Sequence, residues 1–283
     1  MLTPPEWFSH AIAHQPSNRS FNVGDKRLSC LCWGDSHLPA LIFLHGGYAN
    51  AYWFSHIAPQ LSARYFVIAL NFSGHGTSDW RDAYHTEDFL SELSALYETF
   101  SLHDAVLIGF SFGARVAYWF SLQRPSAVKQ LVFLDPPNVH EPISKAFIRQ
   151  ITQAKPIHYY ARDKEILKRF RLIPKQPVTN AYIVDHIAQH AIKSTPQGYT
   201  WQTDPNLFFK LANTAPVIDS PAQTLPPCVL IYGEHSTICT DAVRHGLSIH
   251  HPEIPYIEIS DAYHAIMIDA PQVLIEHLKS VLI

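Results

Sequence analysis

Short runs of apolar residues recur along the chain, and most of them contain no polar residue. Such runs indicate strands that are buried on both faces, as in a parallel sheet covered by helices. The runs lie at residues 41–44, 66–70, 106–109, 131–134, 229–232 and 254–259. Between them apolar residues recur at helical spacing, for example at Phe89, Leu93 and Phe100. The alternation predicts an α/β fold with a mostly parallel sheet of about eight strands flanked by helices.

The beginning of the chain has a different pattern. Residues 21–33 alternate apolar and polar positions and are interrupted by Gly24 and Asp25. We expect an antiparallel hairpin there, which opens the sheet.

A long segment after Asp135 breaks the alternation. From about residue 136 to residue 227 the sequence is rich in proline and has helical stripes but no convincing strand. A connection of this length is too long for a loop in a compact domain. The sequence therefore predicts a core formed by residues 1–135 and 228–283, with a helical cap, residues 136–227, inserted after the strand that ends at Asp135.

The composition excludes several classes of protein. Hydrophobic residues make up 47% of the chain and charged residues 16%, which excludes a disordered protein. The net charge of −3 gives no basic surface for nucleic acid or anionic lipid. The chain has no apolar window of 18 residues, and its first 30 residues do not resemble a signal peptide. We expect a cytoplasmic protein without nucleic-acid partners or membrane insertion, and the sequence leaves its oligomeric state open.

Histidine and cysteine are the residues that first suggest a metal site. Among the 18 histidines, His186 and His190 have the best helical spacing, but Ile187 stands where a metalloprotease carries its glutamate. The four cysteines are scattered, with no C-x-x-C motif, and we expect buried thiols. The sequence therefore predicts no metal and no cofactor.

The segment Gly109-Phe110-Ser111-Phe112-Gly113 carries the clearest chemical signal. An apolar strand precedes it, and good helix formers follow it. A serine on a tight strand-to-helix turn needs small residues two positions before and after it, because the backbone passes close there. The helix N-terminus also offers free N–H groups where an oxyanion would form. We therefore predict that Ser111 is a nucleophile.

A serine hydroxyl needs a general base, and the base needs an orienting carboxylate. His264 follows the last expected strand and precedes the terminal helix. We predict that His264 is the base.

Four motifs in this order resemble the α/β-hydrolase superfamily, in the esterase-like branch with a helical cap. They are residues 45–47 (HGG), 71–78 (NFSGHGTS), 109–113 (GFSFG) and 264–271 (HAIMIDAP). The resemblance spans nearly the whole chain and implies the α/β-hydrolase fold, with a triad in the order nucleophile, acid, histidine. Asn71 replaces the usual aspartate of the second motif, a position that normally serves structure.

The triad acid departs further from the family pattern. Many members carry it after the strand that follows the cap, as G-x-x-D, but here Ser236 stands in that place. Some branches place the acid at the end of the strand before the cap, which corresponds to Asp135. The carboxyl ends of strands gather the sites of open α/β sheets. We favour Asp135, with Glu234, Asp241 or a dyad without an acid as the alternatives.

The resemblance also implies an oxyanion hole. Its donors would be the backbone N–H groups of Phe112, which follows the nucleophile, and of Gly47. Only the alignment of the motif favours Gly47 over Tyr48. We expect His45 to support the loop through hydrogen bonds.

Aromatic residues of the expected cap could roof an apolar pocket, although most must form the cap's own core. They are Phe147, Tyr159, Tyr160, Phe170, Tyr182, Trp201, Phe208 and Phe209. Together with the resemblance, they favour a cofactor-free serine hydrolase that cleaves a small, largely apolar carboxylic ester through an acyl-serine intermediate.

Other reactions and roles stay open. The same triad could cleave a carbon–carbon bond in a diketone-like substrate. It could also hydrolyse a thioester or an amide. Haloalkane dehalogenases and epoxide hydrolases are disfavoured, since both need a carboxylate where Ser111 stands. Outside enzymes, the fold could serve as an inactive ligand-binding scaffold.

Overall fold

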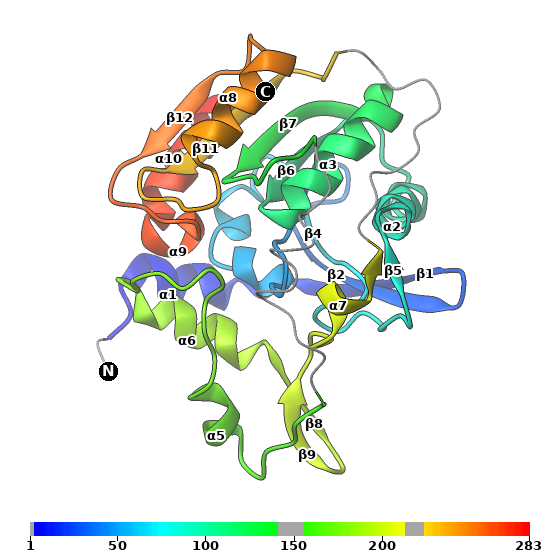
Figure 1. The fold of residues 1–283 in the computed structure, drawn as a ribbon, viewed down its shortest axis with the longest axis vertical. Coiled ribbons are helices and arrows are strands. Elements are labelled where there is room, and N and C mark those ends of the chain that lie inside the picture. Colours follow the sequence, from blue (N-terminus) through cyan, green and yellow to red (C-terminus); the bar gives the residue numbers. More distant parts are fainter. Residues whose placement is uncertain (1–2, 141–155, 213–223) are drawn as a thin grey trace.

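An eight-stranded sheet forms the centre of the computed structural model (Figure 1), which describes residues 3–140, 156–212 and 224–283. Its strand order is β1-β2-β4-β3-β6-β7-β11-β12. The bounds are β1 Ser17–Val23, β2 Lys26–Trp33, β3 Ala40–Leu44, β4 Phe66–Asn71, β6 Ala105–Phe110, β7 Val128–Leu134, β11 Cys228–Gly233 and β12 Tyr256–Ile259. From β4 to β12 all neighbours are parallel, and β1, β2 and β4 pair antiparallel. The expected mostly parallel sheet and its opening hairpin are confirmed.

The sheet is covered by helices on both faces. Successive strand residues point to opposite faces, so Leu41 and Phe43 belong to one apolar cluster, and Ile42 and Leu44 to the other. Helices α2 (Thr86–Thr99), α3 (Phe112–Gln123) and α8 (Asp241–His250) contribute to the cluster of Ile42. Helices α1 (Glu6–Ala13), α9 (Ile266–Asp269) and α10 (Pro271–Val281) contribute to the cluster of Leu41. This two-sided burial explains why the strands appear as unbroken apolar runs.

The segment between β7 and β11 contains both helices and strands. Its described elements are α5 Asp163–Leu167, α6 Ala181–Gln189, β8 Ile192–Thr195, β9 Gly198–Trp201, α7 Leu207–Lys210 and β10 Leu211–Ala212. Most of it projects to one side of the sheet in Figure 1. The expectation of a segment without strands is wrong, because β8 and β9 form an antiparallel hairpin and β10 pairs with β5 (Tyr84–His85). These strands are two to four residues long, too short for alternation to be recognised.

The expected division of the chain coincides with element ends, since β7 ends at Leu134 and β11 begins at Cys228. That division into a core and a cap stays a prediction. Within the described residues, no helix combines the length and the apolar character that a membrane crossing requires.

His56 is a buried histidine that contacts α1 and α9. Its ring packs near Phe8 of α1, with centroids 5.9 Å apart, and Nε2 donates a hydrogen bond to the carbonyl of Met267 in α9 at 2.8 Å. The side chain is fully buried, and burial lowers its pKa to about 4. His56 is therefore neutral in the folded protein at neutral pH.

The stability of the fold should therefore decrease on acidification between pH 6.5 and about 4, where an unfolded histidine binds a proton and His56 does not. One such group contributes a slope of up to about 1.4 kcal/mol per pH unit. His56→Gln retains an N–H donor for Met267 but does not titrate, so its free energy of unfolding should depend less steeply on pH. Urea unfolding at a series of pH values measures both slopes, and equal slopes would contradict the prediction.

Candidate active site

Ser111 lies at the junction of β6 and α3, with φ 50° and ψ −114°. A positive φ is rare for a residue with a side chain, and it persists only where neighbouring contacts fix it. The N–H of Ser111 donates to the carbonyl of Leu134 in β7 at 3.0 Å, and its carbonyl accepts from Ala114 at 3.0 Å. The strand-to-helix turn predicted from the sequence is confirmed, and it presents the hydroxyl at the carboxyl edge of the sheet.

Two glycines allow this turn. A Cβ atom on Gly109 would lie 2.5 Å from the Cα of Ala114. A Cβ on Gly113 would collide with the carbonyl oxygen of Leu44 in β3. Both neighbours are backbone atoms, so neither collision can be relieved by rotating a side chain. The glycines of the motif are therefore required for close packing of the turn.

The structure brings Ser111, His264 and Asp135 together. His264 Nε2 lies 3.1 Å from Ser111 Oγ, and His264 Nδ1 lies 2.6 Å from Asp135 Oδ2. His264 is 5% exposed and Asp135 is fully buried. With the proton on Nδ1, the ring donates to the carboxylate and presents the lone pair of Nε2 to the serine hydroxyl. This arrangement is chemically suited to proton transfer from serine to histidine.

Three donors surround the Asp135 carboxylate. Besides His264, the N–H of Gly233 donates to Oδ1 at 3.0 Å, and the hydroxyl of Ser236 donates to Oδ2 at 2.5 Å. Ser236 Oγ itself accepts from the N–H groups of Ile238 and Cys239. The serine at the position where many family members carry the acid thus donates to Asp135. The sequence showed that Ser236 occupies this position, but the hydrogen bond from Ser236 to Asp135 is visible only in the structure.

The two alternative acids lie elsewhere. Glu234 is exposed, and its Oε2 accepts a hydrogen bond from the N–H of Asp261 at 3.0 Å. The side chain of Asp241 is 98% exposed and pairs with Arg244. In this structure the carboxylate hydrogen-bonded to His264 is therefore that of Asp135.

The N–H groups of Gly47 and Phe112 can bind a developing oxyanion only if neither already donates to another acceptor. Within the described residues, neither group donates to a protein acceptor. The N–H of Tyr48, the alternative to Gly47, donates to His75 Nε2 at 3.3 Å. The structure thus supplies a physical reason to prefer Gly47 over Tyr48.

Two buried histidines support this loop. His45 Nδ1 donates to the carbonyl of Gly46 at 2.8 Å, and its Nε2 accepts from the N–H of Phe72 at 3.2 Å. His75 Nδ1 donates to the carbonyl of Ser73 at 3.1 Å. Burial lowers the pKa of His45 to about 4 and the pKa of His75 well below its usual value. Both rings are therefore neutral, and their Nε2 atoms can accept backbone N–H groups.

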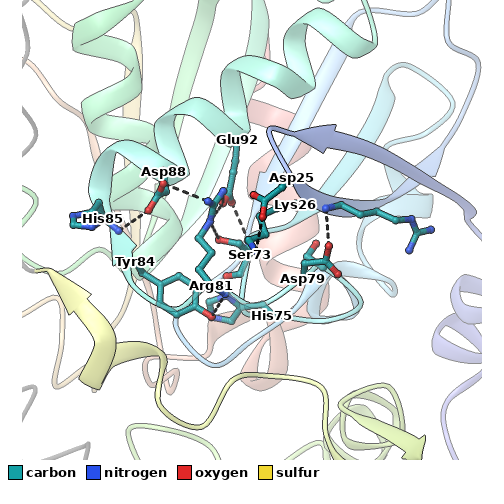
Figure 2. Close-up of polar contacts among 12 residues, drawn as sticks. Asp25, Lys26, Ser73, His75, Asp79, Arg81, Tyr84, His85, Asp88 and Glu92 are labelled. Carbon is teal, nitrogen blue, oxygen red and sulfur yellow. Dashed lines mark hydrogen bonds and ion pairs between the residues drawn. The ribbon is translucent and has the colours of Figure 1, made fainter.

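A buried ion pair holds the segment that carries His75 (Figure 2). Arg81 donates to Glu92 Oε1 through Nε at 3.1 Å and Nη2 at 2.9 Å, and the N–H of Ser73 donates to Glu92 Oε2 at 2.9 Å. Glu92 is fully buried in α2, and burial raises its pKa. The pairing offsets the cost of burying the carboxylate and ties this segment to α2. No local pattern in the sequence predicted this ion pair.

Aromatic side chains lie beside His264 and over the loop that contains Gly47. The ring of Phe110 lies 4.8 Å from that of His264, and Phe208 lies 4.9 Å from Tyr48. A Cβ on Gly47 would collide with Phe208, so this ring of α7 covers the loop.

Other aromatic residues of the expected cap do not all pack in this way. Tyr159 and Phe209 are 45% and 60% exposed, and Phe147 lies outside the described residues.

One group of three side chains in the described part of the chain could hold a metal ion. Its members are Glu234, His235 and Asp261, whose ligand atoms lie within 4.8 Å of one another, and all three are exposed. The contacts among Ser111, His264 and Asp135 do not involve this group.

The histidine pair with helical spacing makes structural hydrogen bonds. His186 Nε2 is hydrogen-bonded to the hydroxyl of Ser55, and His190 Nδ1 donates to the carbonyl of His186.

Comparisons with known proteins identify the family of the fold. A family model described as the alpha/beta hydrolase fold matches residues 39–271. The serine hydrolase-like protein of Mus musculus is 32% identical over 106 residues, which are 36% of this chain and 34% of that protein. The chain spans only 34% to 56% of the length of this relative and of two human proteins with similar names.

Solved structures show the same fold. A novel esterase from Mycobacterium tuberculosis has a TM-score of 0.74 at 22% identity, over 100% of this chain and 99% of that one. The E-2-(acetamidomethylene)succinate hydrolase has a TM-score of 0.75 at 21% identity, over 94% of this chain and 98% of that one. The expected α/β-hydrolase fold is confirmed.

Replacing Gly113 by alanine should destabilise the protein by about 1–3 kcal/mol or more, because the new Cβ meets the backbone of β3. Gly246 in α8 is the matched control, since a Cβ there meets nothing within 4 Å. Gly246→Ala should stabilise its helix by up to about 1 kcal/mol. Denaturant unfolding of the two variants measures the difference, and equal stabilities would refute the close-packed turn.

Proposed function

Since the chain belongs to the alpha/beta hydrolase family, we propose that it is a serine hydrolase that cleaves a carboxylic ester through an acyl-Ser111 intermediate. The observation that carries this proposal is the continuous set of contacts from Ser111 Oγ through His264 to the buried Asp135. A retained scaffold that only binds ligands has no need for a serine in a strained turn beside an oriented imidazole.

Acylation begins at the hydroxyl. Ser111 Oγ attacks the ester carbonyl carbon while His264 Nε2 takes the hydroxyl proton. The carbonyl oxygen becomes an oxyanion, and the N–H groups of Gly47 and Phe112 donate to it. When the tetrahedral intermediate collapses, His264 returns the proton to the leaving alcohol, and the acyl group stays on Ser111.

Deacylation repeats these steps with water. His264 takes a proton from water, the hydroxide attacks the acyl carbon, and the proton returns to Ser111 Oγ as the carboxylic acid leaves. Asp135 keeps the imidazole in the required tautomer and stabilises the imidazolium that forms in each half-reaction. Gly233 and Ser236 in turn fix the carboxylate.

The surroundings of Ser111 support a small, largely apolar substrate. Phe110 packs beside His264, and Phe208 packs on Tyr48 and Gly47 in the loop proposed to supply an oxyanion donor. Apolar walls with a few fixed polar groups are typical of small-molecule sites. The structurally similar Mycobacterium tuberculosis protein is described as an esterase, which also favours an ester. A panel of aryl esters from acetate to decanoate, run beside a diketone, a thioester and an amide, distinguishes the bond that is cleaved.

Ser111→Ala should abolish covalent labelling by a fluorophosphonate and lower ester hydrolysis by about 10⁴- to 10⁶-fold, because the nucleophile is lost. Ser126→Ala, at an exposed serine away from the site, is the control and should behave as the parent. Gel-based labelling and an aryl-ester assay measure both effects. Labelling that persists in Ser111→Ala would show that another residue reacts.

Asp135→Asn should lower hydrolysis at least about a hundredfold, because an amide cannot stabilise the imidazolium and favours the wrong tautomer of His264. Glu234→Gln and Asp241→Asn should each change hydrolysis less than about tenfold, because their side chains face solvent. The three variants are compared by kcat/KM on one ester. The reverse ranking would move the acid to one of the exposed residues.

A further inference from the structure

The backbone on both sides of His264 is held by one amide and one carboxylate. The N–H of Tyr263 donates to Asp269 Oδ2 at 2.8 Å, and the N–H of Ala265 donates to Gln176 Oε1 at 2.9 Å. Gln176 Nε2 donates to both oxygens of Asp269, at 3.0 and 2.8 Å. The N–H groups of the two residues next to His264 are thus connected through a single pair of side chains.

The loop around His264 has no regular secondary structure, so other segments bind its backbone: besides this pair, the N–H of His235 donates to the carbonyl of Ala262 at 2.8 Å. It lies between β12 and α9, and α9 is a helix of four residues. Ala265 is the N-cap of α9 and has no side chain that could cap the helix. The acceptor for the N–H of Ala265 comes from Gln176, which is 89 residues away in the sequence.

A second amide of the same segment reinforces the contact. Asn180 Nδ2 donates to the carbonyls of Ile268 and Asp269, at 2.8 and 3.1 Å. Gln176 and Asn180 both precede α6, within the segment that joins β7 to β11. This segment therefore binds the loop next to His264 and also the C-terminal end of α9.

Asp269 depends on Gln176 for its own pairing. Burial raises the pKa of Asp269 to about 6, and the hydrogen bonds from Tyr263 and Gln176 act against that rise. Without the amide of Gln176, the carboxylate would keep a single backbone donor while the N–H of Ala265 would lose its acceptor. A buried polar group that loses its partner is costly, so the loop would shift to find new partners.

We propose that Gln176 is a positioning residue for the base: together with Asp269 it fixes the backbone of His264, so that the imidazole stays within reach of Ser111. The proposal rests on the proposed function for its catalytic consequence. Gln176 touches no reacting atom, and its effect passes through the 3.1 Å contact between His264 Nε2 and Ser111 Oγ. A displacement of about 1 Å between reacting groups can lower a rate about a hundredfold.

Gln176→Met tests the proposal, because methionine keeps the length of the side chain but neither donates nor accepts these hydrogen bonds. The kcat of ester hydrolysis should decrease about 10- to 100-fold while KM changes less than about threefold, since the base and not the substrate pocket is displaced. Fluorophosphonate labelling of Ser111 should slow in parallel. Gln197→Met, at an exposed glutamine on the turn between β8 and β9, is the matched control and should behave as the parent.

A double-mutant cycle separates coupling from simple loss of structure. Asp269→Ala alone should lower kcat, and adding Gln176→Met should lower it by less than the product of the single effects, because both act through the same loop. A kcat of Gln176→Met within twofold of the parent, or effects that multiply fully in the cycle, would overturn the proposal.

Amide hydrogen exchange without substrate tests the positioning independently of the reaction. Exchange at Tyr263 and Ala265 should speed up in Gln176→Met and stay unchanged in Gln197→Met. Unchanged exchange at both amides would also overturn the proposal. If the parent neither hydrolyses esters nor reacts with a fluorophosphonate, the proposed function fails, while faster exchange in Gln176→Met would still show that Gln176 holds the loop.

Discussion

The buried carboxylate of Asp135 is the group on which the arrangement of the site depends. A fully buried carboxylate is costly unless donors surround it. Its donors come from β11 through Gly233, from the following turn through Ser236, and from the loop after β12 through His264. β7 and β11 must therefore keep their register, in which Leu134 pairs with Ile231. Gly233 must also be a glycine, because a Cβ there would lie 2.5 Å from the carbonyl oxygen of Ala262.

A carboxylate that reaches His264 can stand at the end of either β7 or β11, because these two strands are neighbours in the sheet. Both strands end at the same edge of the sheet, on the same side as the loop of His264. A side chain at either strand end can therefore approach His264 Nδ1. In this chain Asp135 makes that contact, and Ser236 has become its donor. A hydroxyl at position 236 fits this role, because it can give its one proton to the carboxylate while it accepts from two backbone N–H groups.

The sequence predicted those parts of the structure that local patterns encode. The apolar runs became parallel strands because burial on both faces leaves no polar position, and the glycines around Ser111 indicated a turn with no space for a Cβ. Contacts between distant segments left no such pattern. Gln176 and Asp269 meet across 93 residues, and neither position is unusual in its local sequence. Among the aromatic residues of the expected cap, Phe208 packs on Gly47 while the adjacent Phe209 is exposed, and only the orientation of the short α7 decides between them.

Backbone strain is concentrated near the proposed site residues. Six non-glycine residues in the described ranges have a positive φ, and four of them, Tyr48, Ser111, Asp135 and Asp261, lie at the carboxyl edge of the sheet. Each such conformation costs about 1–3 kcal/mol and persists only where the surroundings impose it. The backbone conformations of Ser111 and Asp135 are fixed by adjacent strands, since their N–H groups donate to the carbonyls of Leu134 and Ile231. The strain thus lies at the proposed nucleophile and the proposed acid, and rigid strands hold both groups. His264 lies on an irregular loop instead, and there the neighbouring backbone is bonded by side chains, including Gln176 from a distant segment of the chain.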